Sequence, residues 1–250
     1  MEIKSFIKRY ADFSNGDTHR FRSFDLCYGY FCGEIRSIIA SHEQRGASAE
    51  EKSKALEPHL EESCVRLWAY LASWGMLRGS SGLLSHNYSV LTPVVRVIYN
   101  TPSAFWHIDA DNYLNVSYDG LHTNAQLVVA KYEEIESVFN RHNATGNSVR
   151  ISPTITLVTK IMLGVFGNVP AFDTNFSAAL ANAYRDLPRR FNEKLLRLVA
   201  DFYSSHWSAF DAFQIPVRTF AEDNVDGLYY PKAKLIDMWG FSQGGDDDVQ

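Results

Sequence analysis

Apolar residues recur at three- and four-residue steps along most of the chain, which predicts a mainly α-helical protein. The clearest periodic segment is 61–77, where Cys64, Leu67, Trp68, Leu71 and Trp74 share one helical face. Residues 24–41 have the length and apolar content of a buried helix. Residues 90–100 are apolar and rich in β-branched side chains, and they fit a helix or a strand. Residues 101–120 contain several Pro, Asn and Gly and are predicted to be a loop.

Capping patterns mark two helix starts. Residues 48–51 and 123–126 each place a Ser or Thr three positions before a Glu or Gln, which is the pattern of a capping box. The second pattern predicts a helix that ends near Arg141. Residues 143–148 are then typical of a turn.

Four further helices are predicted in the C-terminal half. Ser152-Pro153 is a start signal for the first of them, which is expected to stop at Gly167-Asn168. After a short link, Asp173 caps the second helix, expected over residues 176–186. The third is expected over residues 188–210, and a short helix ends the folded part of the chain.

Length and composition agree with one globular domain. The chain has 250 residues, of which 46% are hydrophobic and 21% charged. We expect a single helical domain over 1–250, and the pattern also allows two lobes, 1–120 and 121–243. Residues 244–250 are predicted to be a solvated acidic tail.

Charge and cysteine content limit the partners and the compartment. The net charge of −5 excludes binding of a polyanion by overall charge, so any nucleic-acid contact needs a local basic face. The three cysteines, Cys27, Cys32 and Cys64, form no disulfide pattern and indicate a reducing, cytoplasmic location. The sequence shows neither a leader pattern nor an apolar run that would span a membrane, so no membrane partner is expected.

One segment carries a lead on function. Over residues 154–180 a buried helix ends in Phe-Gly, a link with Pro170 follows, and Asp-Thr-Asn at 173–175 opens the next helix. This resembles the core of the helix-hairpin-helix DNA glycosylases, the superfamily of endonuclease III, alkyladenine and 8-oxoguanine glycosylases. The resemblance covers these 27 residues, and elsewhere only the helical character agrees.

The resemblance implies a helix-hairpin-helix DNA-glycosylase-like fold and a cofactor-free hydrolase. Its partner would be duplex DNA with a modified base, which leaves the helix by base flipping. By resemblance, Asp173 is the catalytic carboxylate. Breaking an N-glycosidic bond builds positive charge on the sugar, and a fixed carboxylate stabilises that charge. The helix N-terminus is expected to keep the carboxylate ionised. The same Asp-Thr-Asn pattern is also a common plain helix cap.

Two departures from the family pattern shape the prediction. The hairpin that holds a DNA phosphate normally contains two glycines, whereas residues 148–153 contain none and the nearest is Gly146. The phosphate grip is therefore altered or lost. The lyase lysine of bifunctional members has no counterpart at residues 152–155, and Lys160 lies further along the helix. The chain is therefore predicted to be monofunctional, with water attack that leaves an abasic site.

Further residues are candidates for substrate contacts. The base pocket is predicted to include Trp74, Arg78, Phe172 and Asn175, although the aromatic side chains also fit core positions. The DNA backbone is predicted to contact Arg150, Arg185, Arg189, Arg190 and Lys194, although intervening acidic residues also fit a solvated charged face. The excised base is expected to be a damaged purine or a hypermodified phage base, in which case the protein would act in anti-phage defence.

Other functions stay open. A non-catalytic helical nucleic-acid-binding protein has the same pattern of helices. Arg36 and His42 have the Arg-x5-His spacing of the HEPN ribonucleases, which cleave RNA. Residues 106–111 contain one His and two Asp, but the spacing matches no metal motif, so a surface loop is predicted and no metal is expected.

Overall fold

The computed structural model describes residues 3–5, 7, 19–78, 81–145, 150–218 and 227–243, and the predicted acidic tail lies outside them. The described part is mainly helical, as predicted. It contains two isolated β-bridges and no β-strand.

The helices of the N-terminal half are α2 (His19–Gly29), η1 (Tyr30–Ile35), α3 (Arg36–Gln44), α4 (Ala49–Leu56), η2 (Glu57–His59), α5 (Leu60–Ser73), η4 (Leu83–Ser85), η5 (Tyr88–Leu91), α6 (Thr92–Tyr99) and η6 (Ser103–His107). Those of the C-terminal half are α7 (Asn124–Ala144), α8 (Ile155–Phe166), α9 (Thr174–Ala183), α10 (Glu193–Phe210) and α11 (Lys232–Gln243).

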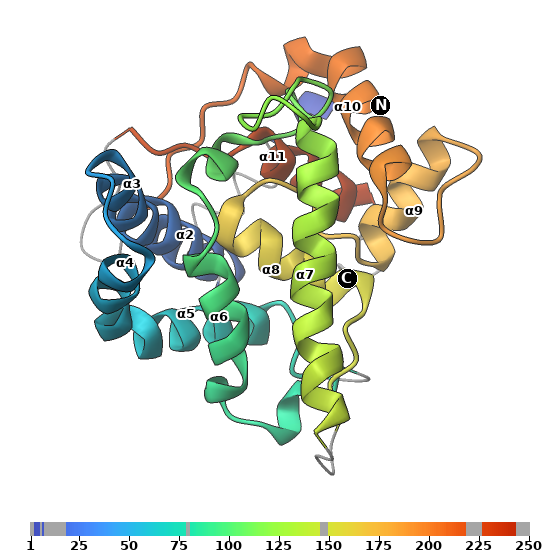
Figure 1. Ribbon diagram of the computed structural model, residues 1–250. Coiled ribbons are helices and arrows are strands. Elements are labelled where there is room, and N and C mark those ends of the chain that lie inside the picture. Colours follow the sequence, from blue (N-terminus) through green and yellow to red (C-terminus); the bar gives the residue numbers. More distant parts are fainter. Residues whose placement is uncertain are drawn as a thin grey trace.

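Helix α8 lies at the centre of the molecule. In Figure 1 the long helix α7 passes in front of α8, with α2 to α6 on one side and α9 and α10 on the other. Every residue from 157 to 166 is buried. One continuous hydrophobic cluster includes residues from both sides of position 120, and the division into lobes there stays a prediction.

The N-terminal helices differ from the predicted pattern in detail. The single helix expected over 24–41 is a continuous run of α2, the π-helix η1 and α3. The ambiguous stretch 90–100 is helical, because α6 begins at Thr92 with Pro93 in its first turn. The expected loop 101–120 contains the short helix η6.

Both predicted capping boxes are confirmed. The Ser48 hydroxyl accepts the Glu51 N–H at 3.2 Å, and Glu51 accepts the Ser48 N–H at 2.8 Å. Thr123 and Gln126 form the same reciprocal pair at the start of α7, where the Thr123 hydroxyl accepts the Gln126 N–H at 3.3 Å. These bonds satisfy backbone donors that a helix start leaves free.

Some boundaries in the C-terminal half were wrong. Helix α8 is capped by Thr154 rather than Ser152, and its stop at Gly167 is confirmed, with φ at 68° in the left-handed region. The helix expected over 188–210 begins only at Glu193, because Asn192 caps it and Pro188 lies in non-helical chain.

The predicted surface loop 106–111 is partly a core element. Trp106 and Ile108 are buried. The Asp109 carboxylate accepts the backbone N–H groups of Lys232 and Ala233 at 2.6 and 2.8 Å, and it thereby caps α11 from a distant part of the chain. Burial raises the pKa of Asp109 to about 7 although backbone donors oppose this shift.

Helices α9 and α11 pack against each other more extensively than any other pair of described elements. Their close approach depends on Gly240. A Cβ there would lie 2.3 Å from Cδ2 of the Phe176 ring and 3.2 Å from the Phe176 Cα. Because α9 begins at Asp173, this contact also fixes the position of that carboxylate.

We expect Gly240→Ala to lower the free energy of unfolding by about 1–3 kcal/mol, because the added methyl group has no room between α9 and α11. Gly33→Ala is the matched control, since a Cβ at this helical position has nothing within 4 Å. It should leave stability unchanged or raise it by up to about 1 kcal/mol. Urea unfolding measures both, and equal stability of the two variants would contradict the close packing.

Candidate active site

Asp173 is the N-cap of α9, as predicted. Its Oδ1 accepts the Phe176 N–H at 3.0 Å. Its backbone is extended and leads out of the link after α8. The side chain is 17% exposed, so it is mostly covered and a small part of it reaches solvent.

Two threonines of α8 place Asp173. The Thr156 hydroxyl donates to the Phe172 carbonyl at 2.9 Å, and the Thr159 hydroxyl accepts the Phe172 N–H at 3.0 Å. Gly167 reverses the chain, and these two bonds then hold the link against α8. Asp173 therefore lies beside the face of α8 that carries the two threonines, and Lys160 lies on that face as well.

Lys160 is the charged partner of Asp173, although its position in the sequence does not match the lyase lysine of the glycosylases. Its Nζ lies 3.6 Å from Asp173 Oδ2 and donates to the Trp74 carbonyl at 3.2 Å. The residue is 4% exposed and is the one charged residue of α8. A single lysine in the run of buried residues from Leu157 to Phe166 was the sequence signal for this position.

A second ion pair, on α11, holds the link between α8 and α9 through a hydrogen bond to Ala171. Lys234 Nζ lies 2.9 Å from Asp237 Oδ2, and Asp237 Oδ1 accepts the Ala171 N–H at 3.0 Å. Both side chains are buried. Lys234 Nζ also lies 4.8 Å from the centre of the Phe24 ring and 4.7 Å from that of Trp74. We call Lys160, Asp173, Lys234 and Asp237 the buried charge cluster.

Burial sets the protonation tendencies in this cluster. Burial raises the pKa of Asp173, and the Asp237 carboxylate adds to the effect. The Phe176 N–H and Lys160 oppose the rise, as expected for a helix cap, but they do not outweigh it. Burial likewise lowers the pKa of Lys160, and the carboxylates of Asp173 and Asp237 oppose that shift.

Two polar atoms that border the cluster have no partner among the described residues. They are Nε1 of Trp74 and Oδ1 of Asp25, both shielded from solvent. Burial raises the pKa of Asp25 to about 6, against a hydrogen bond from Tyr230. Trp74 Nε1 can donate a hydrogen bond and Asp25 Oδ1 can accept one. Buried polar atoms of this kind are normally hydrogen-bonded to a polar ligand or to ordered water.

The predicted base-pocket residues lie in different environments. Trp74 is 8% exposed, between the ammonium groups of Lys160 and Lys234 and the Phe241 ring. Phe172 is buried against Phe176 and Phe191, so its ring belongs to the core. Arg78 is exposed and Asn175 is half-buried. Of the four, Trp74 is the one that contacts the buried charge cluster.

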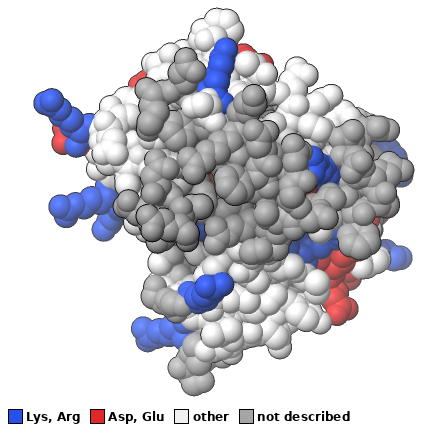
Figure 2. All heavy atoms as spheres, turned by 180° about the vertical axis from the view of Figure 1, so that it is seen from behind, with Lys and Arg blue, Asp and Glu red and all other residues white. Residues whose placement is uncertain are grey.

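The predicted DNA-backbone residues are exposed. Residues 185–197 carry five basic and two acidic side chains, a net charge of +3. The sequence predicted helices over 176–186 and 188–210, but Arg185, Arg189 and Arg190 lie in the non-helical stretch between α9 and α10. Lys194 lies on α10. None of the four forms an ion pair with another described residue. On the face shown in Figure 2, Lys and Arg side chains project singly rather than as one patch.

The altered hairpin is only partly described, since residues 146–149 lie outside the described ranges. Arg150 is exposed. Its carbonyl packs against Gly82, where a Cβ would lie 2.0 Å from the oxygen. The Ser152 N–H donates to the Ser81 carbonyl at 2.9 Å. Through this hydrogen bond the backbone of residues 150–152 lies against residues 81–82.

The alternative ribonuclease pair lies on α3. The His42 Nδ1 contacts the Ile38 carbonyl at 2.8 Å. Arg36 is six residues away on the same helix, about 9 Å along its axis. Side chains at this separation do not face each other on one helix.

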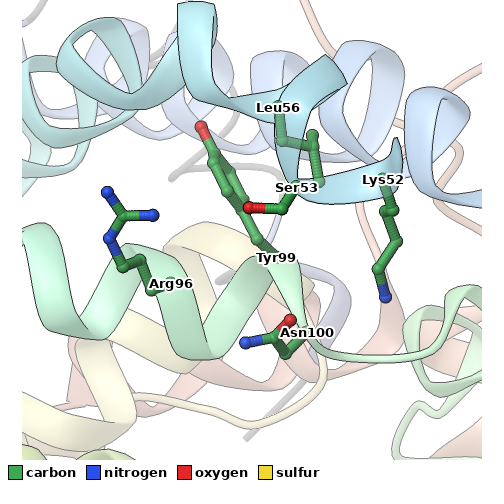
Figure 3. A pocket seen from close by; sticks show the side chains of 6 residues that line it. All are labelled: Lys52, Ser53, Leu56, Arg96, Tyr99 and Asn100. Atoms are coloured by element: carbon green, nitrogen blue, oxygen red, sulfur yellow. The ribbon is translucent and has the colours of Figure 1, made fainter. Parts of the chain in front are cut away.

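A small hollow between α4 and α6 has no comparable set of groups. It measures about 60 Å³ and is lined by Lys52, Ser53, Leu56, Arg96, Tyr99 and Asn100, as Figure 3 shows. Arg96 is bound by Glu57 through two 3.0 Å hydrogen bonds, and the Tyr99 hydroxyl bonds to Ser63 at 2.7 Å. The Arg96 guanidinium and the Tyr99 hydroxyl are thus already hydrogen-bonded within the protein.

Among the described residues, no three or more His, Cys, Asp or Glu side chains are grouped to hold a metal ion. In the same part of the chain, no helix has both the length and the hydropathy needed to cross a membrane. Comparison with protein-family models, curated proteins and solved structures finds no match in any of the three.

We expect a carboxyl ¹³C titration of Asp173 to give a pKa above the ordinary 3.8. Lys160→Met should raise it further, because a nearby positive charge is removed. Asp237→Asn should lower it, because a like charge is removed. Shifts of the same sign in both variants would contradict the cluster.

The same shift predicts a pH dependence of stability. A raised pKa in the folded state means that ionisation of Asp173 disfavours folding. The contribution of this residue to the free energy of unfolding is therefore full below pH 3.8 and is lost as the pH rises through the folded-state pKa.

Proposed function

We propose that this chain is a DNA N-glycosylase that releases a modified or damaged base from duplex DNA. The observation that supports the proposal is the Asp173 carboxylate, which is fixed at the start of α9, is partly exposed and lies 3.6 Å from the Lys160 ammonium. The resemblance of residues 154–180 to helix-hairpin-helix glycosylases supports the same assignment.

The proposed reaction is hydrolysis through a cationic sugar. The bond between C1′ and the base nitrogen breaks, and its electron pair leaves with the base. Positive charge spreads over C1′ and the ring oxygen, beside Asp173. The oxygen of a water molecule then bonds to C1′, one water proton leaves through the carboxylate, and the base gains a proton. The products are the free base and an abasic site.

Burial of the carboxylate favours this role. In a site with little water, a fixed negative charge interacts more strongly with a developing positive charge than it does in bulk water. The Phe176 N–H fixes one oxygen and Lys160 lies beside the other, so the group needs little reorganisation. Asp237 holds the link through the Ala171 N–H and limits movement of Asp173.

The exposed basic stretch 185–197 suits the proposed partner. It directly follows α9 in the sequence, and its net charge of +3 offsets the acidic average of the chain. Arginine side chains free of ion pairs are suited to phosphate contacts. The proposed substrates are a damaged purine or a hypermodified phage base, and the second would give the protein a defence function.

The contact between Lys160 and Asp173 favours a second candidate. A neutral Lys160 amine would attack C1′, displace the base and open the sugar ring to an imine, while Asp173 carries the proton. The lowered pKa of Lys160 favours the neutral amine. Its Nζ is nearly covered, however, so water attack remains the first proposal.

We expect Asp173→Asn to abolish the formation of alkali-labile abasic sites on duplex DNA that carries a panel of candidate bases. The amide keeps the size and one capping oxygen but lacks the negative charge. Asp201→Asn, the same change at an exposed position on α10, should retain full activity. Melting temperatures of both variants verify folding.

Unchanged activity of Asp173→Asn would overturn the proposal, and DNA binding without any product would favour the non-catalytic alternative. Borohydride in the same assay separates the two chemical routes. A covalent protein–DNA adduct that disappears in Lys160→Gln supports the imine, whereas free abasic product without adduct supports water attack.

A further inference from the structure

A second group of chemically active side chains lies outside the buried charge cluster. It lines an open hollow of about 440 Å³ between the segment from η4 to α6 and the end of α7. The lining residues are Ser85, His86, Asn87, Ser89, Val90, Pro93 and His142. None of them belongs to the buried charge cluster.

Two imidazole rings meet in this hollow. The centres of the His86 and His142 rings are 5.2 Å apart, and the ring planes are inclined at 76°. His86 Nε2 is shielded from solvent and has no hydrogen-bond partner among the described residues. Orphaned ring nitrogens are uncommon, because a buried polar atom normally has a partner.

The backbone around the two histidines is held in place. Next to His142, the Asn143 amide donates to the Ile151 carbonyl at 2.6 Å and accepts the Ile151 N–H at 2.8 Å. Next to His86, the Asn87 side chain accepts the Ser89 N–H at 2.9 Å. The two rings are therefore presented from fixed backbone positions, although they come from residues far apart in the sequence.

The chemistry of the lining selects the class of ligand. Among the described residues, no Lys or Arg lines the hollow, so they offer an anion little compensating charge. Imidazole nitrogens bind Zn²⁺, Cu²⁺ and Ni²⁺ in preference to Mg²⁺ and Ca²⁺, which prefer oxygen ligands. Water would complete the coordination of such an ion, and the hydroxyl groups of Ser85 and Ser89, which also line the hollow, are polar partners for that water.

We propose that His86 and His142 together bind a first-row transition-metal dication, such as Zn²⁺, at this hollow. The ion lies between the two rings and gives His86 Nε2 the partner that it lacks. Binding requires that the two half-buried rings turn about their side-chain bonds so that one nitrogen of each faces the ion. With two protein ligands, the ion keeps open positions for water or a further ligand.

The test uses the full chain without a histidine tag and Zn²⁺ alone, in competition with a chromophoric chelator. We expect binding that saturates at one ion per chain and that weakens by about tenfold or more in His86→Gln and in His142→Gln. His122→Gln is the matched control, because His122 lies beside the Asp119 carboxylate at 2.7 Å and could compete for the ion as a surface site. It should leave the affinity unchanged.

Absence of saturable binding overturns the proposal. So does binding that survives in either His86→Gln or His142→Gln, or loss of binding in His122→Gln. If a variant fails to fold, the wild-type chain decides: imidazole NMR signals of His86 and His142 should both shift on addition of Zn²⁺, and shifts at other histidines alone overturn the assignment.

Discussion

Two lysines and two aspartates are covered by the apolar interior, and each ammonium lies within 3.6 Å of a carboxylate oxygen. Moving one such charge out of water costs several kcal/mol, and the cost is offset only by a close counter-charge and further hydrogen bonds. Lys234 and Asp237 supply both, through a 2.9 Å contact and the bond to the Ala171 N–H. The pair of Lys160 and Asp173 has a longer contact of 3.6 Å, and the Asp173 side chain is partly exposed. We therefore assign a structural role to the Lys234–Asp237 pair. Under the proposed function, the Lys160–Asp173 pair is the one that acts on the substrate.

This constraint ties together elements that are distant in the sequence. The Trp74 carbonyl at the end of α5 accepts the Lys160 ammonium, and α11 supplies the second pair. The α8 threonines hold the link, and Gly240 lets α11 approach α9 closely. A change in any of these contacts shifts the carboxylate of Asp173 or its pKa. The proposed activity therefore depends on the packing of the whole centre and not on the helix cap alone.

Local signals in the sequence predicted local structure well. The capping boxes, the Gly167 stop and the Asp173 cap follow from hydrogen bonds within a few residues, so their patterns were readable. The start of α10 was missed because an Asn cap at position 192 competes with the stronger signal of Pro188. Lys160 was set aside because its sequence position does not fit a lyase, whereas its contact with Asp173 arises from the chain reversal between them. The Lys234–Asp237 pair and the capping of α11 by Asp109 depend on tertiary contacts that no short pattern encodes.

The central claim is that Asp173 faces positive charge on a deoxyribose. The most direct measurement compares the affinity of the protein for two duplexes, one with a cationic pyrrolidine in place of a nucleotide and one with a neutral tetrahydrofuran of the same shape. A site built for a cationic transition state binds the charged analogue more tightly. We predict such a preference in the wild-type chain and its loss in Asp173→Asn. Equal affinity of the wild-type chain for both duplexes would contradict the account.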